Sequence, residues 1–334
     1  MSESADRVRS GAQAQPETMP LRFVTAASLF DGHDAAINLM RRLIQDQGCE
    51  VIHLGHNRSV AEVVNAAIQE DADGIAVSSY QGGHNEYFRY MIDMLRELGA
   101  EHIRVFGGGG GTITPEEIAA LEAYGVERIY HPHDGLQMGL PGMIEDLVER
   151  TRKARRPTRM PPEISLDQPL SIGQALSAIE DGSLDEDSLA RLRREWRLAG
   201  GKRPVIGITG TGGAGKSSVT DELLSRFMQY FPALRIAVLA VDPTRRRTGG
   251  ALLGDRIRMN SLRNPNIFMR SMATRRQHLA TSAMLTDAVA FLKAAGFDLV
   301  VVETAGIGQS DSEIVDLVDL PIYVMTSEYG AASQ

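Results

Sequence analysis

The sequence predicts an α/β protein built from two parallel-sheet domains that follow one another along the chain. Three observations support this class. Short apolar segments alternate with amphipathic segments of helical period in both halves. The chain of 334 residues exceeds the usual size of one domain. Its 43% hydrophobic and 23% charged residues provide an ample core. We expect a disordered tail over 1–20, a first domain over 21–150, a linker over 151–202 and a second domain over 203–334.

The composition also excludes several functional classes. A formal net charge of -8 argues against a surface that holds nucleic acid. The longest apolar runs, such as "IAVLAV" and "LVVV", are too short to span a membrane. The first twenty residues lack an apolar segment and favour a disordered tail over a signal peptide. Cys49 is the only cysteine, so no disulfide forms within the chain, and we expect a cytoplasmic protein.

Five strand–helix repeats in the first domain predict a flavodoxin-like, doubly wound sheet. The expected strands cover 21–29, 49–55, 73–80, 102–108 and 126–131, and the expected helices begin near Asp34, Val60, Asn85, Pro115 and Gly135. The third helix should bury one apolar face, because apolar residues recur at spacings of three and four. These residues are Tyr87, Tyr90, Met91, Met94, Leu95 and Leu98. In such a sheet, ligands bind beyond the carboxyl ends of the strands.

Unusual residues stand at those strand ends. The first strand is followed by "DGHD", the third by "SSYQGGH" and the fourth by five glycines, 107–111. Asp31 lies two residues before His33, so its carboxylate can accept the imidazole N–H that a metal does not use. A single histidine cannot build a zinc site, but it can give an axial ligand to a metal held by a macrocycle. Taken singly, these patterns are also typical of an ordinary turn and a flexible loop.

Together these residues resemble the Asp-x-His-x-x-Gly, Ser-x-Leu and Gly-Gly signature of the cobalamin-binding domain in adenosylcobalamin-dependent mutases. The matching positions are Asp31 and His33, then Ser78, then Gly107 and Gly108. Ala36 replaces the family's glycine, and Tyr80 replaces its leucine. The resemblance implies that His33 ligates cobalt in place of the cofactor's dimethylbenzimidazole, whose tail enters a slot past Ser78 and the glycines.

The linker begins with a basic, proline-bearing segment and continues with acidic, helical stretches. Pro157, Pro161 and Pro162 disfavour a continuous helix across it. Trp196, the only tryptophan, is expected to pack a linker helix onto a neighbouring domain.

The second domain opens with a P-loop. An apolar strand, 205–209, runs into Gly210-x-x-x-x-Gly215-Lys216-Ser217 and then into an amphipathic helix. In this context successive backbone N–H groups converge on phosphate oxygens at a helix N-terminus. Lys216 should reach the terminal phosphates, and the Ser217 hydroxyl should ligate Mg²⁺. The nucleotide-binding candidates are Gly210, Gly212, Gly213, Ala214, Gly215, Lys216, Ser217 and Ser218.

Two later strands should bring carboxylates to the same site. Asp242 and Glu303 each end an apolar segment, where a carboxylate suits Mg²⁺. Gly306 follows and can donate its N–H to a γ-phosphate, as switch loops do. Most GTPases place aspartate where Glu303 stands. Lys216 and Glu303 are our catalytic candidates.

The segments "VDPTRRRTGGALLGDRIRM" and "VETAGIGQSDSE" closely resemble the GTPase that chaperones methylmalonyl-CoA mutase. This resemblance implies GTP as the nucleotide and places Asp242, Asp255 and Glu303 in the Mg²⁺ and switch apparatus. The pairing of domains resembles the N-terminal portion of the fused isobutyryl-CoA mutases. It implies, for a full-length homodimer, adenosylcobalamin-dependent radical rearrangement of isobutyryl-CoA to n-butyryl-CoA. GTP hydrolysis would gate the loading and protection of the cofactor.

The chain ends before an Asn-Lys-x-Asp element that would hold guanine and before a barrel that would bind acyl-CoA. We therefore expect an incomplete P-loop domain, weak nucleotide hydrolysis and no mutase activity without the barrel. One alternative is a cobalamin-dependent sensor or transport module coupled to a P-loop NTPase. Another is a kinase joined to a receiver domain, which is disfavoured because Ser78 stands near the position of the receiver's aspartate.

Overall fold

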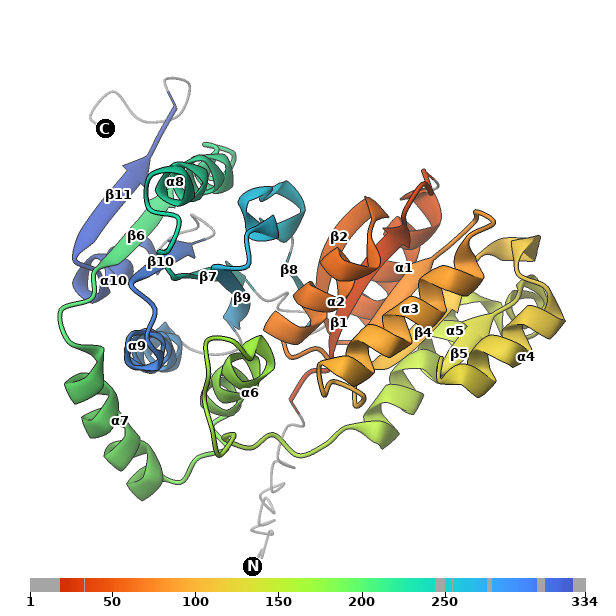
Figure 1. Cartoon of the computed structure of the whole chain (residues 1–334), viewed down its shortest axis with the longest axis horizontal. Coiled ribbons are helices and arrows are strands. Elements are labelled where there is room, and N and C mark those ends of the chain that lie inside the picture. Colours follow the sequence, from red (N-terminus) through yellow and green to blue (C-terminus); the bar gives the residue numbers. More distant parts are fainter. Residues whose placement is uncertain are drawn as a thin grey trace, which may run out of the picture.

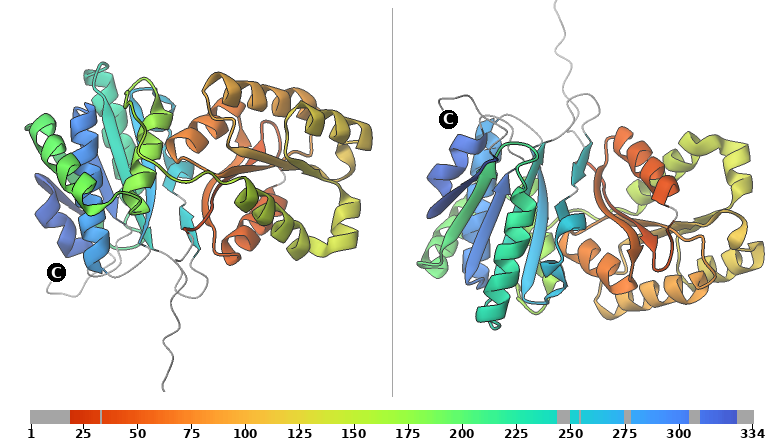
Figure 2. Two further views of the ribbon diagram at one scale, coloured as in Figure 1. Left: turned by 90° about the horizontal axis from the view of Figure 1, so that it is seen from below. Right: turned by 90° about the horizontal axis from the view of Figure 1, so that it is seen from above.

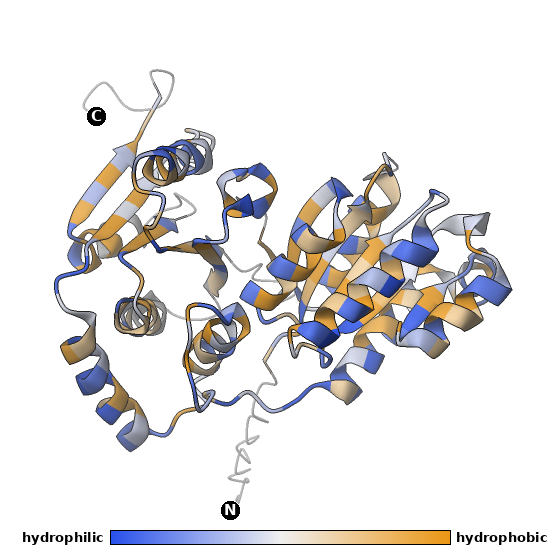
Figure 3. Cartoon of the chain, viewed as in Figure 1, coloured by the Kyte–Doolittle hydropathy of each residue, from blue (hydrophilic) through white to orange (hydrophobic). Residues whose placement is uncertain are grey.

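The computed structural model describes residues 19–32, 34–243, 250–253, 255–274, 278–304 and 310–326. It shows two α/β units side by side, each a parallel sheet flanked by helices (Figures 1 and 2). Apolar residues fill the strands and the inner faces of the helices (Figure 3). The predicted α/β class with two parallel sheets is confirmed.

The first sheet has the strand order β5-β4-β3-β1-β2-β8, which contains the predicted flavodoxin order. Its first five strands are β1 (Arg22–Ser28), β2 (Glu50–Arg58), β3 (Gly74–Ser78), β4 (Arg104–Gly108) and β5 (Arg128–Tyr130). Their pairings are all parallel. Every residue of β1 is buried, because helices cover both faces of this sheet, and its sequence therefore shows little polar alternation.

The helices of the first unit are α1 (Asp34–Asp46), α2 (Val60–Gln69), α3 (His84–Glu97), α4 (Pro115–Tyr124) and α5 (Pro132–Ala154). Local sequence explains two of their starts: Ser59 with Glu62 and Thr114 with Glu117 form capping boxes. The apolar face predicted for α3 was too wide. Tyr87, Met91 and Leu95 are buried there, whereas Tyr90 and Leu98 are exposed.

The second sheet has the order β11-β6-β10-β7-β9. Its strands are β6 (Val205–Gly210), β7 (Ile236–Pro243), β9 (Ile267–Thr274), β10 (Leu299–Thr304) and β11 (Leu320–Val324). Helices α8 (Lys216–Tyr230), α9 (His278–Ala295) and α10 (Ser310–Leu317) accompany them, with short 3-10 helices η2 (Asp255–Arg258) and η3 (Ser261–Arg263). The first unit has one further 3-10 helix, η1 (Gly110–Thr112). No helix of the described residues is long and apolar enough to cross a membrane.

Two helices occupy the predicted linker, α6 (Pro169–Glu180) and α7 (Glu186–Gly200). Ile172 and Leu176 of α6 belong to the core of the second unit. On its other side α6 packs against α2, since a methyl group at Gly173 would meet the Ile68 carbonyl at 2.7 Å. Trp196 of α7 packs as expected, with its ring 5.6 Å from that of Phe291 in α9. Helix α6 therefore packs between the two units, and α7 packs on the second unit.

One strand crosses from the second half of the chain into the first sheet. Strand β8 (Ala251–Leu253) follows β7 in sequence but pairs in parallel with β2, from Glu50–Ala251 to Ile52–Leu253. Its approach is close: a methyl group at Gly250 would lie 2.2 Å from the Gln45 carbonyl oxygen. This strand was not predicted, because it is short and belongs to the sheet of the other domain.

Candidate functional site

Three predicted elements meet at the carboxyl edge of the first sheet. Across neighbouring strands, Ala27 pairs with Ser78, Ser78 with Gly108, and Gly108 with Tyr130. Asp31 follows β1 at this same edge. The fold thus brings the loops after β1, β3 and β4 together, although they are far apart in sequence.

A cavity of about 290 Å³ opens at this edge between the ends of β3 and β4 and helices α1 and α5. Most of its walls are apolar, including Ile37, Phe106 and Met143, and the backbone of 107–110 completes them. The buried Ser78 hydroxyl lies in the wall and has no hydrogen-bond partner among the described residues. A buried polar group without a partner is rare and needs an explanation. An apolar aromatic ligand with one hydrogen-bonding atom fits these walls.

Asp31 ties two of the loops together. Its carboxylate is almost fully buried and accepts the backbone N–H of Tyr80 at 2.8 Å. Beside it, the Ser28 hydroxyl donates to the Ser79 hydroxyl at 3.0 Å. His33 lies outside the described residues, so its contact with Asp31 stays a prediction. The Tyr80 N–H fixes the position of the Asp31 carboxylate. A carboxylate fixed in this way can orient a histidine that ligates a metal.

Two of the glycines are required by the packing of the protein itself. A methyl group at Gly107 would lie 2.5 Å from Phe88 and Ile129 side-chain atoms, and one at Gly109 would lie 1.9 Å from the Ser79 carbonyl oxygen. Neither distance is tolerable for a Cβ atom. These positions therefore need glycine whether or not a ligand is bound. Gly108 differs, because its nearest neighbour would be the Tyr130 carbonyl oxygen at an ordinary 3.5 Å.

This contrast allows a test of the cavity. Gly108→Ala should fold normally but weaken binding of the predicted ligand, cobalamin, by about tenfold if the loss matches one misfitted contact of roughly 1.4 kcal/mol. Gly111→Ala is the matched control, because it meets nothing within 4 Å and does not line the cavity. Titration of cobalamin absorbance and thermal melting would measure both. Equal affinities in the two variants would contradict a ligand seated against Gly108.

The P-loop of the second unit has the geometry its sequence predicts. Gly210, Gly213 and Gly215 have φ values of 144°, 79° and 87°, which favour glycine. A methyl group at Gly210 would also meet the Val324 carbonyl oxygen at 1.9 Å. The Lys216 ammonium donates to the carbonyls of Gly210 and Thr211, at 3.0 and 3.1 Å. The lysine thus lies over the loop, where a phosphate-bearing ligand would meet it.

The Glu303 carboxylate lies beside the P-loop helix. It is buried and accepts hydrogen bonds from the hydroxyls of Ser217 and Thr220, each at 2.7 Å. Asp242 is the last residue but one of the adjacent strand β7, whose Ala240 pairs with Glu303. Sequence reasoning missed Thr220, whose signal was its position one helical turn after Ser217. Gly306 and the side chain of Asp255 lie outside what the structure describes.

Comparison with known proteins finds a family match for each half of the chain. Residues 21–134 match the family model described as "B12 binding domain". Residues 172–334 match the model for "Methylmalonyl Co-A mutase-associated GTPase MeaB". The chain joins a B12-binding domain to a MeaB-type GTPase domain. The predicted pairing of a cobalamin-binding unit with a chaperone-type GTPase is therefore confirmed.

Three similar proteins are each named "Fused isobutyryl-CoA mutase". That of Cupriavidus metallidurans is 58% identical over 347 residues, covering 100% of this chain and 31% of the relative. That of Geobacillus kaustophilus is 54% identical, covering 94% and 30%. That of Nocardia farcinica is 56% identical, covering 94% and 29%. The chain thus spans about three tenths of the length of these relatives and has the predicted similarity to the fused mutases.

Proposed function

We propose that this chain binds adenosylcobalamin and Mg²⁺–GTP as the cofactor-handling part of an isobutyryl-CoA mutase. The observation that carries the proposal is the apolar cavity with the unpartnered Ser78 hydroxyl at the carboxyl edge of a flavodoxin-like sheet. Ligands bind sheets of this topology at that edge. The similarity to fused isobutyryl-CoA mutases supports the choice of ligand and reaction.

Residues of the first unit have distinct roles in this proposal. His33 would ligate cobalt, Asp31 would orient the imidazole, and Ser78 would donate to the dimethylbenzimidazole in the cavity. The walls formed by 107–110 and α5 keep water from that base. Bound adenosylcobalamin supplies a cobalt–carbon bond whose homolysis starts radical rearrangements. The chain's own contribution is to hold and orient the cofactor.

In the second unit, Lys216 and the P-loop amides bind the phosphates, and Ser217 ligates Mg²⁺. Glu303, Asp242 and Asp255 complete the metal site, and Gly306 contacts the γ-phosphate. Hydrolysis of GTP then gates loading and protection of the cofactor in the first unit. In this proposal the cobalamin-binding domain ends at residue 150, and the GTPase domain begins after residue 202.

A mutase barrel that binds acyl-CoA is the proposed partner, within a homodimer that acts in the cytoplasm. Two large apolar side chains support a covering partner: Phe30 and Leu136, at the carboxyl edge of the sheet, are each 83% exposed. Cys49 is buried, and burial raises the pKa of its thiol to about 12, so this thiol is unreactive. An unreactive, buried, free thiol is compatible with a reducing compartment.

Absorption spectra of bound cobalamin test the proposal. Wild-type protein should shift the spectrum to that of a histidine-ligated cobalamin, and His33→Ala should bind more weakly without the shift. His56→Ala is a matched control, since His56 is an exposed histidine at the end of β2. A His33→Ala spectrum identical to that of the wild type would refute axial ligation by His33.

A further inference from the structure

The facing edges of the two sheets are connected by segments that cross between the units. Strand β8 of the second half extends the first sheet beyond β2, while β9 is the edge strand of the second sheet. The open edge of β9 is covered by the C-terminal end of α2. The Gln69 side chain accepts the Met269 N–H at 3.2 Å and donates to the Ile267 carbonyl at 3.4 Å. Two side-chain groups of the first unit therefore replace a neighbouring strand.

Glu70 continues this pairing. Its buried carboxylate accepts the Ser271 N–H at 2.9 Å and the Ser271 hydroxyl at 3.0 Å. It also accepts the Arg256 guanidinium at 2.7 Å. Arg256 in turn donates to the Met269 carbonyl and to the Gln69 side chain, each at 2.6 Å. Two nitrogens of this guanidinium, Nε and Nη2, thus bind the C-terminal end of α2 and strand β9.

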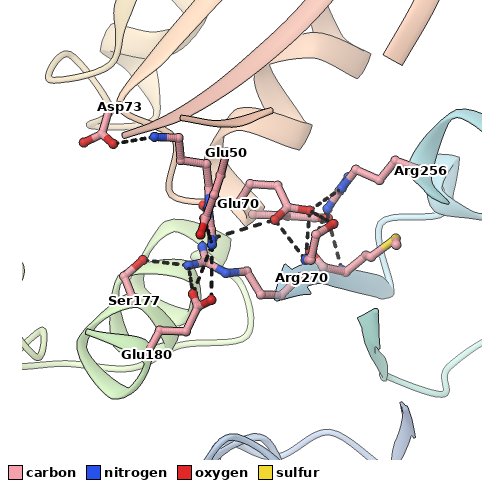
Figure 4. Close-up of polar contacts among 11 residues, drawn as sticks. Glu50, Glu70, Asp73, Ser177, Glu180, Arg256 and Arg270 are labelled. Carbon is pink, nitrogen blue, oxygen red and sulfur yellow. Dashed lines mark hydrogen bonds and ion pairs between the residues drawn. The ribbon is translucent and has the colours of Figure 1, made fainter. Parts of the chain in front are cut away.

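Glu70 and Arg256 belong to a balanced, buried cluster, whose labelled members converge in Figure 4. Three arginines face three glutamates: Arg22, Arg256 and Arg270 with Glu50, Glu70 and Glu180. The first unit, the α6 helix and the second unit all contribute. Burial alone would lower the pKa of Arg22, but the attraction of Glu180, Glu50 and Glu70 outweighs it and raises that pKa. A buried ion-pair cluster to which the first unit, α6 and the second unit all contribute favours one relative orientation of the three.

Arg256 follows directly after Asp255, the predicted Mg²⁺ residue. The segment around it, residues 250–253 and 255–263, is the bridging segment. Its start pairs with β2, and the Ile257 side chain lies on Gly55, where a methyl group would approach to 2.7 Å. Its end meets the P-loop helix, because the Ser261 N–H donates to Asp221 of α8 at 2.8 Å. One segment thus contacts the frameworks of both ligand sites.

We infer that Arg256 is a positioning residue, which fixes the Mg²⁺-site segment to the cobalamin-binding domain and thereby links the two affinities. The inference rests on the proposed function, since it requires both ligands. A shift of the bridging segment on nucleotide binding must displace β8 along β2 or break the Arg256 contacts with Gln69 and Glu70. Linkage is reciprocal, so each ligand must change the affinity of the other by the same factor.

Binding titrations of the whole chain test this inference. Cobalamin affinity is measured by absorbance with and without a saturating, non-hydrolysable GTP analogue and Mg²⁺, and nucleotide affinity is measured with and without cobalamin. In wild-type protein we expect each ligand to change the other's affinity by about fivefold or more. Arg256→Gln should reduce that factor to within about twofold of one, while both ligands still bind.

Two further variants keep the test decisive if Arg256→Gln fails to fold. Ile257→Ala removes a 40% exposed side chain that lies against Gly55 of β2, and it should also reduce the coupling factor. Arg263→Ala is the matched control: its pair with Glu62 also joins the two units, but Arg263 is 70% exposed, so coupling should persist.

The outcomes separate the two proposals. Should both ligands bind to wild-type protein without affecting each other, the inference fails and the proposed function stands. Should one ligand not bind at all, the proposed function fails and the inference with it. Wild-type coupling in folded Arg256→Gln, or in Ile257→Ala, would also overturn the inference.

Discussion

Arg270→Met lowers the free energy of unfolding by about 3–5 kcal/mol, the expected loss when one partner of a buried ion pair is removed. Arg270 is 1% exposed, and its guanidinium donates to Glu180 at 2.6 Å, to Ser177 at 2.9 Å and to the Glu70 carbonyl. Methionine keeps most of the volume but removes the cation and its hydrogen bonds, so that three buried glutamates face two arginines. Urea denaturation followed by circular dichroism would measure the change.

A surface arginine provides the comparison for that loss. Arg226 pairs with Glu222 one turn away on α8, and both side chains are more than half exposed. Arg226→Met should therefore change stability by less than about 1 kcal/mol, as is usual for surface pairs. Equal effects of the two substitutions would mean that the buried cluster does not hold the units in place.

Glu303→Gln should reduce Mg²⁺-dependent nucleotide hydrolysis by roughly 10²–10³-fold, the range seen when one preorganised electrostatic group is lost. The glutamine keeps the shape of the side chain, and its one carbonyl oxygen can accept only one of the hydroxyls of Ser217 and Thr220 as before. It removes the negative charge beside the metal site. Phosphate release over a Mg²⁺ titration would show both a lower maximum and a higher Mg²⁺ requirement.

Glu222→Gln is the matched control for this charge, because Glu222 lies on the same helix and its side chain is 62% exposed. Its hydrolysis rate should stay within about twofold of the wild type, since surface charges act weakly through water. A Glu303→Gln rate within the same twofold range would remove Glu303 from the proposed metal site.

Local sequence determined much of this protein. Strand and helix positions followed from apolar periodicity, which requires only neighbouring residues, and the capping boxes at Ser59 and Thr114 mark helix starts within one turn. The P-loop could also be predicted, because Gly210 and Gly215 have positive φ values that favour glycine in the sequence motif itself. The same holds for the predicted ligand-bearing loops, since the carboxyl ends of parallel strands must share one edge.

Local sequence did not reveal why particular side chains are charged or small in the interior. Gly107 matched a cofactor-binding signature in sequence, yet Phe88 and Ile129 leave no room for a methyl group there even without a ligand. Thr220 looked like an ordinary helical residue, yet it holds Glu303 from 83 positions away. Such requirements come from atoms that only folding brings into contact.

The joint between the domains was decided by tertiary structure alone. Strand β8 has three residues, too few to give a strand pattern in the sequence. It forms by pairing with the edge of β2. Glu70 and Arg256 are 186 positions apart, and each reads in sequence as a solvated surface charge. Burial changes that meaning, because a charge removed from water must find an opposite charge in one defined geometry. The sequence contains the charges, but only the packed chain pairs them.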